Sequence, residues 1–156
     1  MAALFVAGCS SHDDGKAAGS EDNIAKMLMI EAVQPNADTY WQAVQYISDE
    51  NGSREIMPQS DAEWETVAAA ARKLGQLGED MQKPEYAEGR GADWTAYAQG
   101  LVAVSQQAEE AAAAQDPEKV LDVGGTLYNV CSACHETYMT NPAGMAPSWR
   151  AVQPAE

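Results

Sequence analysis

Five residues near the end of the chain, Cys131-Ser132-Ala133-Cys134-His135, constrain its fold more than any other feature. A C-x-x-C-H pattern is the signature of covalent c-type haem attachment. On a helix, two cysteines three residues apart lie on one face, so both thiols can bond to one edge of a haem. His135 comes next and can bind the iron as the proximal ligand. The pattern therefore predicts one covalent haem c, held by Cys131 and Cys134 with His135 on the iron.

Two other kinds of site also use closely spaced cysteines. A redox-active C-x-x-C pair is expected at the start of a helix near a βαβ pattern, and this sequence has no such pattern. A zinc site takes three or four protein ligands. The only further cysteine and histidine are Cys9 and His12, both in a polar N-terminal segment. Both alternatives are therefore weaker than covalent haem.

Charge and length limit the class of protein. The chain has 156 residues, a natural size for one domain, and a formal net charge of −15. Such an acidic chain is a poor match for nucleic acid or for an anionic membrane surface. No apolar run in the sequence is long enough to span a bilayer. We expect an extracytoplasmic protein whose acidic surface either meets a basic redox partner protein or simply keeps the chain monodisperse.

The N-terminal segment resembles the end of a bacterial lipoprotein signal. Val6-Ala7-Gly8-Cys9 matches a lipobox, in which Cys9 becomes the first mature residue and carries the lipid. Such signals have a basic start and a longer apolar stretch, whereas only eight residues precede Cys9, which suggests a natural start further upstream. We interpret residues 1–20 as a signal remnant and a flexible tether. This predicts a lipid anchor on the periplasmic side of a bacterial membrane.

Four amphipathic stretches follow the tether, each bounded by capping or helix-breaking residues. They run from Ser20 to just before Asn51, from Ser60 to Pro84, from near Asp93 to Ala114, and from Asp116 to Asn141. Pro35 interrupts the first stretch and predicts a kink there. No segment has the pattern of a strand ladder. The sequence predicts an all-α domain over residues 21–140, an antiparallel up-down-up-down four-helix bundle, with an irregular tail over 141–156.

The haem motif lies on the last predicted helix, so the inner faces of the other three helices must cover the haem. Gly75, Gly78 and Gly124 fall on inner faces. A missing side chain at these positions would leave room for the macrocycle, although glycine inside a helix costs about 1 kcal/mol relative to alanine.

An all-helical chain of this size with C-x-x-C-H on its last helix resembles the cytochrome c′ family, the class II c-type cytochromes. The pattern Leu28-Met29…Pro35-x-Ala37-Asp38-x-x-Trp41 is similar to one branch of that family. The resemblance covers residues 24–138 and implies that the first helix supplies the side chain on the distal side of the iron. Relatives often dimerise through their first two helices, so a homodimer is one expectation.

The sixth iron ligand decides the function. A second histidine ligand is effectively excluded, because His12 is the only other histidine and lies in the tether. In the resembled family the distal residue is methionine in low-spin members and apolar in many high-spin members. Met29 matches the branch pattern and is the first candidate, and Met27 is the second. The two are two residues apart and cannot share a helix face, and both also suit core packing.

These ligands predict two functions. With methionine on the iron, the chain is an electron carrier rather than an enzyme, acting in outer-sphere electron transfer. With an open iron, it is a five-coordinate module that binds or senses small gases such as nitric oxide or carbon monoxide. A peroxidase would need an acid–base group on the distal side, and the sequence offers no histidine for that role.

Overall fold

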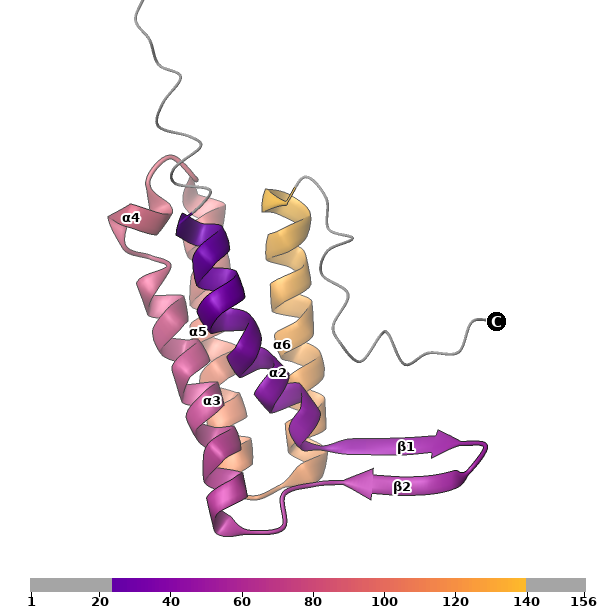
Figure 1. Ribbon diagram of the computed structural model, residues 1–156. Coiled ribbons are helices and arrows are strands. Elements are labelled where there is room, and N and C mark those ends of the chain that lie inside the picture. The colour runs from indigo at the N-terminus through magenta and orange to yellow at the C-terminus, as the bar shows by residue number, and fades with distance from the viewer. Residues whose placement is uncertain (1–23, 140–156) are drawn as a thin grey trace, which may run out of the picture.

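The computed structural model describes residues 24–139, which are mostly helical with one small two-stranded sheet (Figure 1). Helical residues 24–28 lead into a π-helical turn. The elements are η1 (Met29–Val33), α2 (Gln34–Ala43), β1 (Gln45–Asp49), β2 (Gly52–Ile56), α3 (Asp61–Asp80), α4 (Pro84–Ala87), α5 (Ala92–Ala113) and α6 (Pro117–Tyr138). The predictions for residues 1–20, including lipidation of Cys9, and for the tail over 141–156 lie outside the described residues.

Two of the predicted helix starts are confirmed by their caps. At α3 the hydroxyl of Ser60 accepts from the Glu63 backbone N–H, and the Glu63 carboxylate accepts from the Ser60 N–H in return. At α6 the Asp116 side chain accepts from the backbone N–H of Lys119, and Pro117 occupies the first turn. Both arrangements satisfy backbone N–H groups that a helix start leaves without partners.

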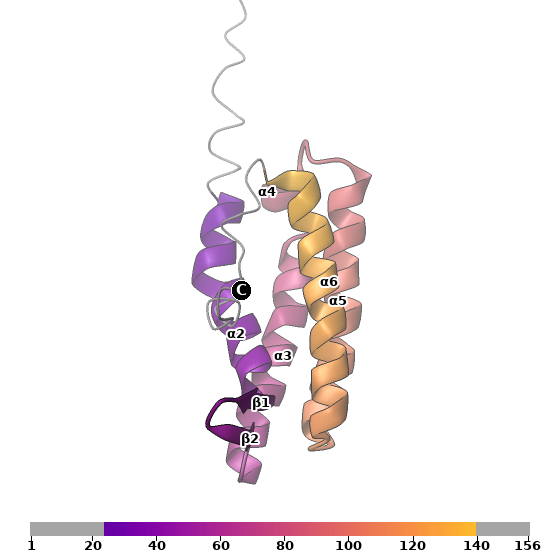
Figure 2. The ribbon, with the colours of Figure 1, turned by 90° about the vertical axis from the view of Figure 1, so that its right-hand side faces the viewer.

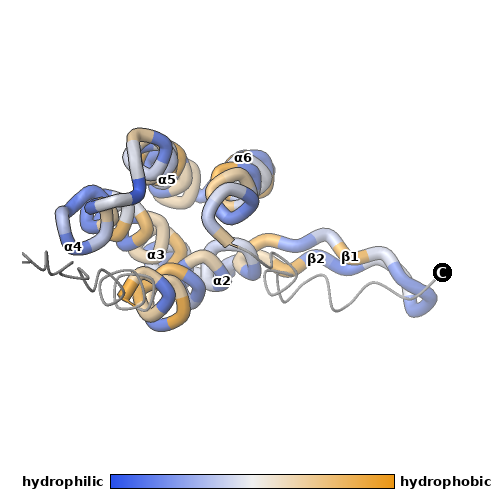
Figure 3. The backbone as a smooth tube through the Cα atoms, turned by 90° about the horizontal axis from the view of Figure 1, so that it is seen from above, coloured by the Kyte–Doolittle hydropathy of each residue, from blue (hydrophilic) through white to orange (hydrophobic). Residues whose placement is uncertain are grey.

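The prediction of one helical stretch up to Asn51, with no strand in the chain, is wrong. The first helix ends at Ala43, and residues 45–56 form an antiparallel hairpin in which Gln45 pairs with Ile56 and Asp49 with Gly52. Asn-Gly is a hairpin-turn dipeptide, and Gly52 adopts φ +113°, which L side chains rarely adopt. Viewed along the helices, the hairpin extends sideways beyond them (Figure 3).

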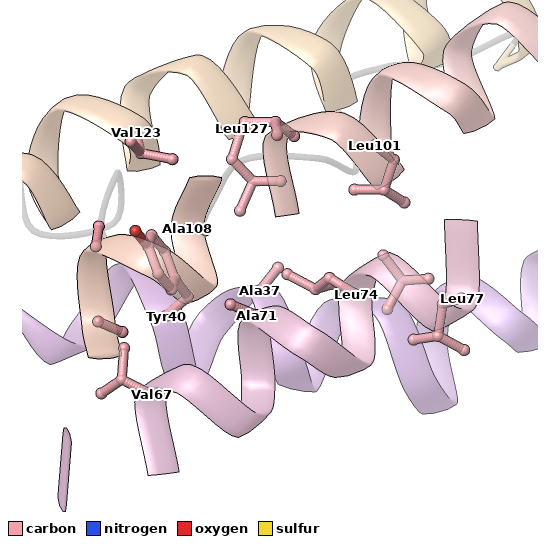
Figure 4. Close-up of a cluster of buried hydrophobic side chains, with 14 of the residues drawn as sticks. Ala37, Tyr40, Val67, Ala71, Leu74, Leu77, Leu101, Ala108, Val123 and Leu127 are labelled. Carbon is pink, nitrogen blue, oxygen red and sulfur yellow. The ribbon is translucent and has the colours of Figure 1, made fainter. Parts of the chain in front are cut away.

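The core lies where α3 packs along α5 and where α5 packs along α6, while α2 packs mainly on α3. Leucines from α3, α5 and α6 meet the inner residues Ala37 and Tyr40 of α2 (Figure 4). By contrast, α2 approaches α6 in few places, and Figure 2 shows the two helices apart on this side. Within the described range, no helix is long and apolar enough to cross a membrane.

The three inner-face glycines were predicted to leave room for a haem, and not all of them lie where a haem could use that room. A Cβ on Gly78 would lie 2.9 Å from a Val102 methyl group and 3.0 Å from the Ala98 carbonyl oxygen, so this glycine lets α3 approach α5 closely. A Cβ on Gly75 would also face α5, 3.5 Å from Ser105. Only Gly124, which faces Trp41 of α2, lies on the side between α2 and α6. The expectation that Gly75 and Gly78 make room for a macrocycle is therefore wrong.

Candidate haem site

Helix α6 carries the three residues of the C-x-x-C-H motif on the side that faces the first helix. Cys131 and Cys134 lie one turn apart, and His135 follows directly. The side chains of all three border one pocket. Cys134 is buried, with 7% of its surface exposed. The spacing of the motif thus presents both thiols and the imidazole to the same space.

The pocket lies between the first helix and α6, and Tyr97 and Leu101 of α5 and Met81, the residue after α3, complete its lining. Most of its lining is apolar or aromatic: Met29, Val33, Ala37, Trp41, Met81, Tyr97, Leu101, Tyr128 and Val130, with Gln34 among the polar members. Such a lining suits an apolar cofactor.

The two candidate methionines of the first helix, Met29 and Met27, border different grooves. Met29 borders the pocket together with the motif residues. Met27 is 43% exposed and lies beside Ile24, Leu28 and Tyr86 in a different groove. Of the two, only Met29 faces the space that His135 faces.

A further methionine, Met81, was set aside as a ligand in the sequence reasoning because it lies near the end of a predicted helix. Met81 follows the end of α3, is 3% exposed and also borders the pocket. Its carbonyl oxygen accepts a 2.7 Å hydrogen bond from the indole of Trp94. A buried methionine after a helix is ordinary core packing, so the sequence carried no signal that separates it from a ligand.

The environment of the two thiols argues against a redox-active pair. Burial raises the pKa of Cys131 to about 12 and that of Cys134 to about 11, both from 9.0. Redox-active and nucleophilic cysteines have lowered pKa values, because the thiolate is the reactive form. These buried, protonated thiols therefore lack the lowered pKa values of a redox-active pair.

The imidazole of His135 fits an iron ligand. Its Nδ1 atom is buried and has no hydrogen-bond partner among the described residues. Burial also lowers the pKa of the ring, so the imidazole is neutral at pH 7. Neutral imidazole is the form that binds metals. Two thiols and a neutral imidazole that border one apolar pocket are a donor set that fits a haem.

A loop packs on the end of α6 near Cys134. The Tyr138 hydroxyl donates to the Arg90 carbonyl oxygen at 2.9 Å. The Arg90 guanidinium lies 4.5 Å from the centre of the Trp94 ring, and the Tyr138 ring meets Trp94 edge-on. These contacts hold the loop and the last turn of α6 together next to Cys134.

Within residues 24–139, no group of three or more His, Cys, Asp and Glu side chains gathers in a way that could hold a metal ion. In comparisons with protein-family models, curated proteins and solved structures, none matches this chain.

Proposed function

We propose that this protein is a c-type cytochrome that carries one covalently bound haem and acts in outer-sphere electron transfer in the periplasm. One observation carries the proposal: Cys131, Cys134, His135 and Met29 border the same apolar pocket, although Met29 lies about a hundred residues from the others. Two thiols, a neutral imidazole and a thioether sulfur are the groups that a six-coordinate haem c requires.

In this proposal each residue has one task. The Cys131 and Cys134 sulfurs would hold the haem covalently, and the His135 imidazole on α6 would bind the iron. The Met29 sulfur on the first helix would be the second iron ligand and would favour the reduced state. Bound haem would supply one-electron chemistry between ferric and ferrous iron. The apolar lining around it excludes water, which also raises the potential.

The fold belongs to the same proposal. The long helices would form an antiparallel up-down-up-down four-helix bundle of the cytochrome c′ type, with the haem motif on its last helix. The lateral hairpin over residues 45–56 is an addition to the expected pattern. Partner and location rest on the sequence: the net charge of −15 suits a redox partner with a basic surface. The lipobox at Cys9 suits a lipid anchor on the periplasmic side.

The first test is the absorption spectrum of the purified protein after periplasmic maturation, oxidised and then reduced. We expect covalent haem, a low-spin spectrum and a weak near-infrared sulfur-to-iron band in the ferric form. A high-spin spectrum that changes sharply when carbon monoxide meets the ferrous form would instead identify a gas-binding module with an open iron. Absence of covalent haem would overturn the proposal.

Single variants then identify the sulfur. Met29→Ala should abolish the near-infrared band and give a high-spin spectrum. Met27→Leu should leave both unchanged, because Met27 faces a different groove. Met81→Leu is the matched control inside the pocket and should also keep the band. If Met81→Leu removes the band and Met29→Ala does not, the ligand is Met81.

A further inference from the structure

The first helix contains a π-helical turn, η1, which starts at Met29. Its register is set by the hydrogen bond from the Gln34 N–H to the Met29 carbonyl oxygen, five residues back instead of four. Such turns behave as one residue inserted into an α-helix and are frequent at functional sites. This one lies between the candidate ligand and the rest of the pocket wall.

Five residues of this helix border the pocket, and four of them recur every four positions: Met29, Val33, Ala37 and Trp41, with Gln34 as the fifth. At 3.6 residues per turn, an uninterrupted α-helix would place positions twelve apart about 120° from each other around the axis. One inserted residue removes about 100° of this difference and leaves about 20°. The π turn therefore allows Met29 to share a face with Trp41.

Without the insertion another side chain would take this place. Counting back from Trp41 in a regular α-helix, the position on the pocket face is Ile30. In the structure Ile30 is 56% exposed and points away from the pocket lining. One inserted residue in the helix therefore decides whether the Met29 sulfur or the Ile30 hydrocarbon side chain faces the pocket.

Two neighbouring residues accommodate the π turn. Pro35 has no N–H, so it makes no backbone hydrogen bond where the register changes from five residues back to four. The Asn36 side chain donates to the Ala32 carbonyl oxygen at 2.7 Å and satisfies it inside the changed turn. Both lie next to the turn in sequence, so the register shift is encoded locally.

We propose that the π turn at 29–33 is the device that selects Met29, and not Ile30, as the side chain facing the iron side of the pocket. This inference rests on the proposed function, since it explains how the sixth ligand is presented. The residues of the turn are positioning residues, because they act through Met29.

The test shifts the register in the mature holoprotein. In the first variant an alanine is inserted between Glu31 and Ala32, which places Ile30 twelve positions before Trp41. We expect loss of the near-infrared sulfur-to-iron band and a high-spin ferric spectrum. In the second variant Ile30→Met is added to the insertion, and we expect the band to return. Ile30→Met alone is the matched control and should leave the spectrum unchanged.

A third variant removes Glu31. Met29 would then lie eleven positions before Trp41 in a regular α-helix, which places the two side chains at nearly the same angle around the helix axis as in the natural chain. The near-infrared band should therefore persist. If the insertion variants do not hold haem, this deletion decides alone: a retained band supports the proposal and a lost band overturns it.

The other outcomes are also decisive. Two results would overturn the proposed role of the π turn. One is a band that survives the insertion alone, and the other is a band that stays absent when Ile30→Met is added to the insertion. The function is tested separately by Met29→Ala in the natural register. If Met29→Ala leaves the band intact, ligation by Met29 fails. If it removes the band while the insertion does not, only the positioning role fails.

Discussion

The indole nitrogen of Trp41 donates a hydrogen bond to the carbonyl oxygen of Gly124 at 3.0 Å. This bond joins α2 to α6 beside the candidate haem pocket, on the side where the two helices otherwise make few contacts. The indole also packs directly on this part of α6, since a Cβ on Gly124 would lie 3.4 Å from Cδ1 of the Trp41 ring. The pair therefore sets the distance between the two walls of the pocket.

Trp41→Phe removes the donor and keeps an aromatic ring at this position. We expect the free energy of unfolding to fall by about 1 kcal/mol, the usual net contribution of one such hydrogen bond. Trp94→Phe is the comparison, because its bond to Met81 is shorter, at 2.7 Å, and buried, so its loss should be larger. Urea denaturation measures both, and a Trp41→Phe variant as stable as the natural chain would contradict the assigned role.

The two glycines on α3 should respond in opposite directions to alanine. Gly75→Ala adds a methyl at an ordinary contact distance of 3.5 Å and gains helix propensity, so stability should rise by up to about 1 kcal/mol. Gly78→Ala places a methyl 3.0 Å from the Ala98 carbonyl oxygen, which cannot rotate away, and should cost about 1–3 kcal/mol. Thermal unfolding of both variants gives the comparison. Equal effects would mean that α3 and α5 are not in the close contact described.

The stability of the haem-free chain should fall as the pH rises above 9. The folded chain holds the thiol protons of Cys131 and Cys134 until pKa values of about 12 and about 11, whereas the unfolded chain releases them near 9.0. Above pH 9 the unfolded state binds fewer protons, so alkaline conditions favour unfolding.

This prediction is measured by urea denaturation between pH 8 and pH 11 in a Cys9→Ser background, which removes the only other thiol. The control adds Cys131→Ser and Cys134→Ser and should show a flatter dependence on pH. An identical slope in the control would show that other groups cause the loss of stability.

The start of α3 should be sensitive to Ser60. The Ser60 hydroxyl accepts from the Glu63 N–H at 3.3 Å, and the Glu63 carboxylate accepts from the Ser60 N–H at 3.1 Å. Ser60→Ala should lower the free energy of unfolding by about 1 kcal/mol, measured by urea denaturation, because one backbone N–H loses its acceptor. Ser60→Asp keeps an acceptor and should remain close to the natural chain. A loss of the same size in both variants would rule out the cap as its cause.

Local patterns determined a large part of the fold. Ser60, Asp116 and Pro117 marked helix starts because caps and first-turn prolines act through neighbouring backbone groups. The C-x-x-C-H spacing likewise placed Cys131, Cys134 and His135 together, since residues three and four apart share a helix face. The hairpin over residues 45–56 was missed although Asn51-Gly52 is a turn signal, because the apolar residues before it also fit a helical spacing.

The sequence by itself therefore determined the three long helices α3, α5 and α6, the caps of α3 and α6 and the motif on α6, because these depend on contacts within a few residues. Only the tertiary structure decided which side chains face that motif. Met29 meets it through a π turn that changes the phase of the first helix, and Met81 meets it through packing at the end of α3. A helical wheel drawn at constant pitch cannot show the first, because the π turn changes the number of residues per turn. Spacing along one helix cannot show the second, because the position of Met81 depends on how separate helices pack around a common pocket.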